Sequence, residues 1–157
     1  MRIVLIWIGK TATGYMREAV DDYASRIKRY IPLEIVEVAD VRGVAKDDIN
    51  ALRTAEGVAM MKYVKPDDYL VLLDDKGKQY TSLQLSAEVE RMSLSSTKRV
   101  VYVIGGAFGF SQAMYDRANA LLSLSRLTFS HQMVRAIFLE QVYRAMTIMR
   151  GEPYHHE

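Results

Sequence analysis

The stretch Lys98 to Phe110, KRVVYVIGGAFGF, is the most informative part of this 157-residue chain for its fold class. Its first half is a run of branched and aromatic apolar residues without a polar face, which is typical of a strand covered on both sides in a parallel sheet. The run stops at Gly105-Gly106, Gly109 follows, and Ser111 predicts the start of a helix, SQAMYDRANALL. Open α/β sheets bind small molecules at such strand–glycine–helix turns, although a plain tight connection needs glycine as well.

Three more apolar runs predict strands. Arg2 to Ile8 and Tyr69 to Leu73 have no polar face, whereas Glu34 and Glu37 interrupt Leu33 to Ala39, which is therefore expected nearer a sheet edge. Apolar residues spaced three and four apart predict helices between the strands. The predicted helices cover Thr13 to Tyr30 with Thr13 as its cap, Asp47 to Tyr63, a helix opening at Thr81 or Ser82, and Gln132 to Arg150. This alternation predicts one α/β domain over residues 1–157, with a parallel sheet and helices on both faces.

Two connections in this pattern are less regular. Residues 74–78, DDKGK, are predicted to form a turn or exposed loop after the third strand. The segment from Ser123 to Phe129, SLSRLTF, alternates serine with leucine and predicts a short strand or an extended loop. The last helix carries apolar residues on more than one face, which favours burial against a second subunit, or else a central position within one domain.

Composition limits the function classes. A net charge of +2 is too small to indicate a nucleic-acid binder by itself, although a local basic face is compatible with it. The absence of cysteine excludes disulfides, thiolate metal sites and a cysteine nucleophile, and fits a cytoplasmic protein. The apolar run at the amino end is too short to span a bilayer, so no membrane association is expected.

Few residues carry obvious chemistry. The three histidines, His131, His155 and His156, lack metal-ligand spacing, and no metal is expected. Tyr154 or His155 offers a proton acceptor if the tail folds over a pocket, but terminal tails are usually frayed. The Asp74-Asp75 pair suits a ligand at a strand end and suits a solvated turn equally well. Arginines gather in the last third of the chain, either for solubility or for contact with phosphate.

Several separate stretches together resemble one family. Residues 103–110, VIGGAFGF, 122–135, LSLSRLTFSHQMVR, and 139–157, LEQVYRAMTIMRGEPYHHE, are similar to the SPOUT class of RNA methyltransferases. Within that class the chain resembles the RlmH family, the large-subunit ribosomal RNA pseudouridine N3-methyltransferases, and the likeness includes IVLIWIGK and VLLDDKGK near the start. Ser130 stands where that family commonly has proline.

The resemblance implies a parallel α/β sheet whose carboxyl-terminal segment forms a trefoil knot. It implies S-adenosylmethionine as methyl donor, a homodimer, and an assembled ribosome as the substrate. The donor-binding residues that it implies are Leu73, Gly105, Leu124, Ser125, Arg126, Leu127, Thr128 and Phe129. It further implies that Tyr154 and His155 orient or deprotonate the target base, and that Arg135 and Arg144 hold RNA phosphate or the target.

Two other functions remain open at this stage. The chain can be a non-catalytic ribosome- or RNA-binding module that keeps the fold without the reaction. It can also be a nucleotide-binding α/β protein that uses Gly105 to Ser111 as a phosphate loop, which ranks last because no Walker lysine follows those glycines.

Overall fold

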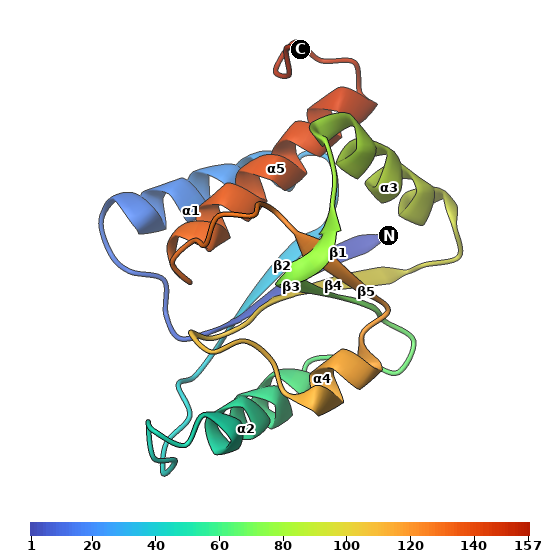
Figure 1. Cartoon of the computed structure of the whole chain (residues 1–157). Helices are drawn as coiled ribbons and strands as arrows, with labels where there is room; N and C mark the ends of the chain where they lie inside the picture. The colour runs from blue at the N-terminus through green and yellow to red at the C-terminus, as the bar shows by residue number, and fades with distance from the viewer.

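The structure is a computed structural model that describes all 157 residues. It contains a five-stranded, wholly parallel sheet with the strand order β2-β1-β4-β3-β5 (Figure 1). The strands are β1 (Arg2–Ile8), β2 (Leu33–Val38), β3 (Tyr69–Gln79), β4 (Arg99–Ile104) and β5 (Ala120–Ser123). The helices are α1 (Tyr15–Ile27), α2 (Ile49–Met61), α3 (Ser82–Leu94), α4 (Gln112–Arg117) and α5 (Met133–Met149). The predicted α/β class with a parallel sheet is confirmed.

Helices cover both faces of the sheet. In Figure 1, α1, α3 and α5 lie on one face, and α2 and α4 lie on the other. Two separate apolar clusters, of 19 and 11 buried residues, fill these two interfaces. Because β1 and β4 are central, alternate residues of each strand enter both clusters, which explains why their sequences have no polar face. β2 is an edge strand, as its interrupting glutamates predicted.

The region after Leu73 differs from its prediction. Residues 74–78 do not form a turn, because β3 continues to Gln79 and pairs again with β5 after an irregularity between Leu73 and Lys78. A Cβ atom on Gly77 would lie 2.5 Å from the backbone of Leu122, so only glycine allows the two strands to approach so closely there. Exposed charges gave the appearance of a loop, but they sit on the solvated part of a strand.

Two helix predictions also need correction. The helix after Ser111 ends at Arg117, and the residues ALLS that follow form β5 instead of its last turn. Ser123 closes that strand, and the rest of the SLSRLTF segment is a connection without regular structure.

Thr13 does not cap α1, since the chain enters the helix through Gly14 at φ 73° without a side-chain cap. Thr81, by contrast, caps α3 and forms a full capping box with Gln84. It is one of the two residues at which this helix was predicted to begin.

The apolar character of α5 has an explanation within one chain. The helix packs against the sheet between α1 and α3, and Phe138, Leu139, Val142 and Met146 belong to the larger cluster (Figure 1). The central position therefore accounts for its broad apolar surface, which no longer argues for a second subunit by itself. No helix is both long and apolar enough to cross a membrane. The passage of the chain through a trefoil knot stays a prediction.

Candidate functional site

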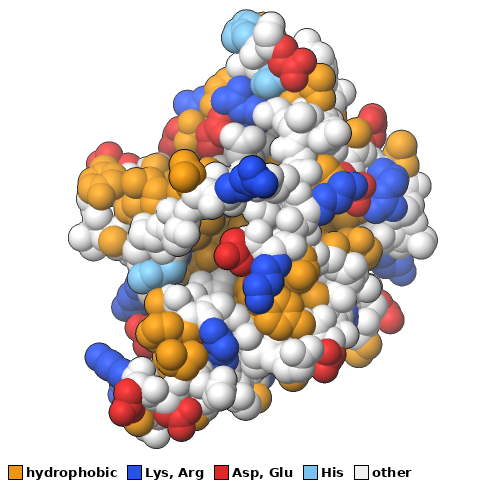
Figure 2. All heavy atoms as spheres, in the orientation of Figure 1, with side chains coloured by type: hydrophobic (Ala, Val, Ile, Leu, Met, Phe, Trp, Pro, Cys, Tyr) orange, Lys and Arg blue, Asp and Glu red, His pale blue; other side chains and the backbone are white.

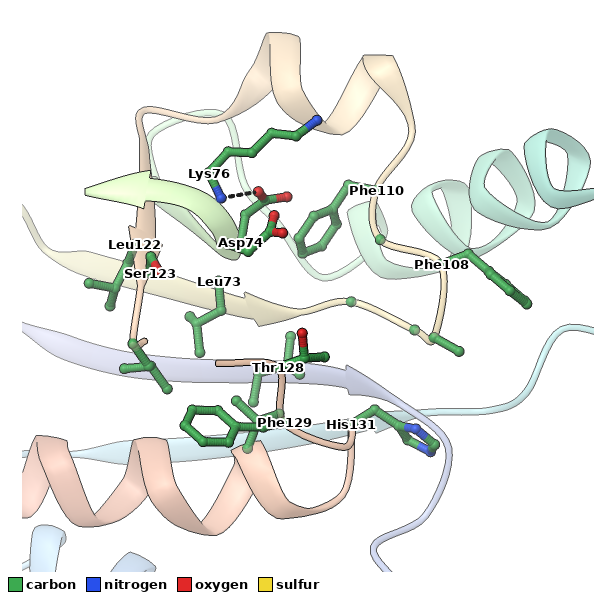
Figure 3. Close-up of a pocket in the computed structure, with 18 of the residues that line it drawn as sticks. Leu73, Asp74, Lys76, Phe108, Phe110, Leu122, Ser123, Thr128, Phe129 and His131 are labelled. Carbon is green, nitrogen blue, oxygen red and sulfur yellow. Dashed lines mark hydrogen bonds between the residues drawn. The ribbon is translucent and has the colours of Figure 1, made fainter. Parts of the chain in front are cut away.

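A cavity of about 500 Å³ opens where the carboxyl ends of β3, β4 and β5 meet (Figures 2 and 3). Half of its 22 lining residues are hydrophobic. The lining comprises Leu73 to Lys76, Ile104 to Phe110, Leu122 to Ser125 and Leu127 to Phe129, with Arg53, Tyr115, His131 and Val134. Such a position, at the carboxyl edge of a parallel sheet, is where ligands bind in open α/β folds.

The residues that the sequence predicted for donor binding meet at this cavity. Leu73 is the last β3 residue that pairs with β4, Gly105 directly follows β4, and the segment from Leu124 to Phe129 forms the opposite wall. Arg126 is the exception, because it is exposed and does not line the cavity. Figure 3 shows Leu73, Thr128 and Phe129 around the same space, although they come from different parts of the chain.

The glycine loop, residues 105–109, makes close contacts with Phe110 and with side chains of α2. A Cβ atom on Gly105 would lie 3.1 Å from the ring of Phe110, and one on Gly106 would lie 2.6 Å from the Glu56 carboxylate. From α2, Arg53 donates a hydrogen bond from Nε to the Phe108 carbonyl at 2.6 Å. The loop therefore has fixed contacts on α2, and its glycines keep the backbone open toward the cavity.

The alternating serines and leucines of the opposite wall have separate tasks. Ser123 donates its hydroxyl to the carbonyl of Ser125 at 3.1 Å, and the Ser125 hydroxyl accepts from the Leu127 amide at 2.9 Å. The serines thus hold the connection by local hydrogen bonds in place of a sheet ladder. Leu124 and Leu127 offer apolar surface to the cavity, and Leu127 is 75% exposed.

Arg135 anchors the start of α5, where His131 and Val134 line the cavity. Its side chain is only 1% exposed. The guanidinium donates to the carbonyls of Ile8 at 2.7 Å, His131 at 3.1 Å and Gly9 at 3.2 Å, and to the Thr11 hydroxyl at 3.2 Å. It is therefore not placed to hold RNA phosphate, because the guanidinium is buried and already donates four hydrogen bonds inside the protein.

Glu37 completes this anchor from the edge strand. Burial alone would raise its pKa, but hydrogen bonds from the Thr11 hydroxyl and amide, Trp7 and Arg17 lower the pKa to about 2. The carboxylate thus remains ionised, 3.9 Å from Arg135, whose guanidinium also lies over the Trp7 ring at 4.9 Å. The network joins β1, β2 and α5 directly behind the cavity.

The carboxyl-terminal tail does not reach the cavity of its own chain. It lies at the opposite end of α5, a helix about 25 Å long, from the end that carries His131 (Figure 1). The tail is not frayed, since the Tyr154 hydroxyl donates to Glu140 at 3.0 Å and its ring packs edge-to-face against Tyr143, with the ring centroids 4.7 Å apart. Tyr30 also donates to Glu152.

Arg144 contacts two residues of the tail and one residue of its own helix. It pairs with Glu140, lies over the Tyr154 ring at 4.8 Å, and contacts Nδ1 of His155 at 3.3 Å. Since a guanidinium only donates, Nδ1 must accept, which places the proton of the neutral imidazole on Nε2. That Nε2 is buried without a hydrogen-bond partner. Burial, with hydrogen bonds to Tyr23 and Glu140, raises the pKa of Tyr154, so its hydroxyl stays protonated.

The predicted site residues therefore form two groups, with the donor set at the cavity and Tyr154, His155 and Arg144 at the far end of α5. Sequence reasoning did not assign Phe110 or Tyr115 to the cavity. It left Asp74 open between a ligand-facing residue and a solvated turn, and Asp74 does line the cavity. Its place directly after a buried strand was the available signal. No group of three or more metal-ligating side chains is present.

Known proteins share this sequence and fold. A family described as "Predicted SPOUT methyltransferase" matches residues 1–155. A protein of Parabacteroides distasonis named ribosomal RNA large subunit methyltransferase H is 49% identical over the full length of both chains. One of the same name from Geobacter metallireducens is 47% identical over 99% of both chains. A solved structure described as a hypothetical protein has a TM-score of 0.51 at 15% identity, over 94% of this chain and 81% of its own, and shares the fold. The chain belongs to the SPOUT methyltransferase family.

Proposed function

We propose that this protein is a cytoplasmic S-adenosylmethionine-dependent methyltransferase that modifies N3 of a pseudouridine in large-subunit ribosomal RNA on the assembled ribosome. The observation that carries the proposal is the cavity at three strand ends, with Gly105 on one side and the Leu124 to Phe129 segment on the other. The relatives named above for ribosomal RNA methylation are similar to the chain over nearly its whole length, which supports this substrate class.

The cavity fits the donor in size and chemistry. Its volume of about 500 Å³ lies within the range of sites for ligands of this size. Leu73, Leu124 and Leu127 offer an apolar slot for adenine, and Gly105 lets the Phe110 ring pack close to the backbone at the cavity, where a side chain would meet it. The donor supplies a methyl group that is already activated by the positive sulfur.

The protein's own task is then mainly alignment. Because methyl transfer to nitrogen needs no covalent cysteine intermediate, a chain without cysteine is compatible with it. The acceptor nitrogen must lose a proton, and the candidates beside it are in the tail. His155 presents Nε2–H and Tyr154 stays protonated, so both are donors here that orient the base by hydrogen bonds. A change of partner at Nδ1 would be needed before His155 accepts a proton.

We further propose that the active site is shared across a homodimer. Since the tail lies at the wrong end of α5 for its own cavity, the tail of a second copy must supply Tyr154, His155 and Arg144. The Nε2 of His155 supports this, because it is buried and makes no hydrogen bond, with the Glu157 carboxylate 3.6 Å away, and a second surface can offer it a closer acceptor.

The substrate is tested with labelled donor and ribosomes that lack the modification. We expect one methyl group on a large-subunit pseudouridine by mass spectrometry, with much lower activity on free rRNA, because a net charge of +2 gives weak attraction to naked RNA. Equal activity on both substrates contradicts the ribosome requirement. Absence of donor binding in calorimetry contradicts the enzyme altogether and favours a non-catalytic binding module.

The shared site is tested by mixing two inactive variants, Gly105→Val for the cavity and His155→Ala for the tail. Random pairing makes half the dimers mixed, and each mixed dimer holds one intact cavity facing one intact tail. The mixture is therefore expected to recover about a quarter of wild-type turnover. A site contained in one chain recovers none, and a monomer in light scattering also contradicts the proposal.

A further inference from the structure

One carboxylate in the cavity has a fixed position and no counter-ion. Asp74 follows the last β3 residue that pairs with β4, and it lines the cavity beside Leu73 (Figure 3). Its Oδ2 accepts a hydrogen bond from the Tyr115 hydroxyl, and its Oδ1 accepts one from the Lys76 amide at 2.8 Å. Each oxygen keeps a further lone pair, so the carboxylate is held from two sides and still able to interact with a ligand.

Asp74 has no charged partner at ion-pair distance. It forms no ion pair in the structure, although Arg53 from α2 also lines the cavity and donates its Nε to the Phe108 carbonyl. Asp75 and Lys76 also line the cavity, and both are exposed, so their opposite charges lie in water at the rim. Burial, together with the bond to Asp74, raises the pKa of Tyr115 to about 12, so Tyr115 remains a protonated donor. Asp74 therefore places a half-buried carboxylate without an ion-pair partner next to the apolar surface of Leu73, and this favours a cationic group at that point of the cavity.

We infer that Asp74, held by Tyr115 and the Lys76 amide, is the electrostatic partner of the donor's positive sulfur and makes the cavity prefer the charged donor over its neutral demethylated product. The inference rests on the proposed function, since it takes S-adenosylmethionine as the ligand. Donor and product differ at that end of the molecule by one methyl group and one charge. A carboxylate facing the sulfur distinguishes them, whereas adenine and ribose contacts do not.

The physical benefit lies in product release. An enzyme that binds both forms equally well is inhibited by its own product, because the two compete for one slot. A single carboxylate at contact distance in a partly apolar site changes the affinity for a cation roughly tenfold or more. Asp74 is thus a specificity-determining residue, and Tyr115 is a positioning residue that keeps its carboxylate at the wall.

The test compares three ligands by calorimetry on the full-length protein: S-adenosylmethionine, S-adenosylhomocysteine, and sinefungin, which carries a cationic amine in place of the sulfonium. We expect Asp74→Asn to weaken binding of the two cationic ligands about tenfold or more and to leave S-adenosylhomocysteine within about twofold. The retained neutral ligand also shows that the variant is folded. Asp67→Asn, which removes the same charge from an exposed position outside the cavity, is the matched control and should change all three affinities little.

Tyr115→Phe gives an independent measurement, because it keeps the charge of Asp74 and removes the hydroxyl that holds it. We expect a smaller loss in the same direction, again confined to the cationic ligands. An equal loss for all three ligands in Asp74→Asn places the carboxylate on a part that they share and overturns the inference. Unchanged affinities overturn it too. If the wild-type protein binds none of the three, the proposed function fails, and the inference fails with it.

Discussion

Replacing Arg135 by methionine should cost the protein much of its stability. The variant keeps an apolar side chain of similar length and removes the guanidinium that serves three carbonyls and the Thr11 hydroxyl. It also leaves Glu37 without its buried partner. Breaking a buried charged network on one side costs roughly 3–5 kcal/mol, and we expect a loss of unfolding free energy in this range.

The assay is urea unfolding followed by circular dichroism, with donor affinity measured by calorimetry under native conditions. For a chain of this length the loss corresponds to a fall in Tm of roughly 10 °C. Donor affinity should fall as well, because Arg135 holds the start of α5 and with it His131 and Val134 of the cavity.

Arg144→Met is the matched control on the same helix. Arg144 pairs with Glu140 four residues earlier, and its side chain is 24% exposed, so its removal should cost less than about 1 kcal/mol. The result that refutes the reasoning is an Arg135→Met protein with wild-type stability and donor affinity but no turnover. That outcome would mean that Arg135 contacts the RNA, as the family resemblance implied.

Three further outcomes are expected. Gly105→Ala should weaken donor binding roughly tenfold in calorimetry, because the added methyl group would lie 3.1 Å from the Phe110 ring; unchanged affinity would mean that the loop is not part of the donor site. His155→Ala should lower turnover about a hundredfold and leave the donor Kd within about twofold, and wild-type turnover would remove the tail from the mechanism. Burial, together with repulsion from Asp40, raises the pKa of Glu56, so its ionised form destabilises the fold above that pKa and the penalty disappears below the unfolded-state pKa. Glu56→Gln should therefore stabilise the protein in urea titrations at about pH 8 but not at about pH 4, whereas an equal effect at both pH values contradicts this assignment.

Much of the fold could be predicted because its strands are buried on both faces. Such strands have unbroken apolar runs, and β1, β3 and β4 begin where those runs begin. The predictions were wrong where a strand is short or partly solvated. Residues 120–123 look helical after QAMYDR, and β3 beyond Leu73 carries charges because that part faces water. Local pattern does not reveal which strand edge is available for pairing, and this decided both cases.

The candidate site was predictable to a different degree at its two ends. Glycine after a buried strand, and a family motif, were sufficient to indicate Gly105 and the Leu124 to Phe129 wall. The role of Arg135 could not be predicted, because an arginine on a helix has the same sequence signature whether it faces solvent or three carbonyls. One of these carbonyls belongs to Gly9, which lies 126 residues earlier in the chain. Only the folded structure brings it within hydrogen-bond distance of Arg135.

The cavity is assembled from segments that leave the ribosome at very different times. Its first wall is complete near residue 76, its second near 110, and its last only at 134, with most of α5 still to be synthesised. A nascent chain that stops short of β5 exposes one whole edge of β3, an apolar strand ready to pair with another polypeptide. A ligand that needs all three walls can stabilise only the finished product by mass action. Protection from proteolysis by S-adenosylmethionine would therefore distinguish complete molecules from truncated ones.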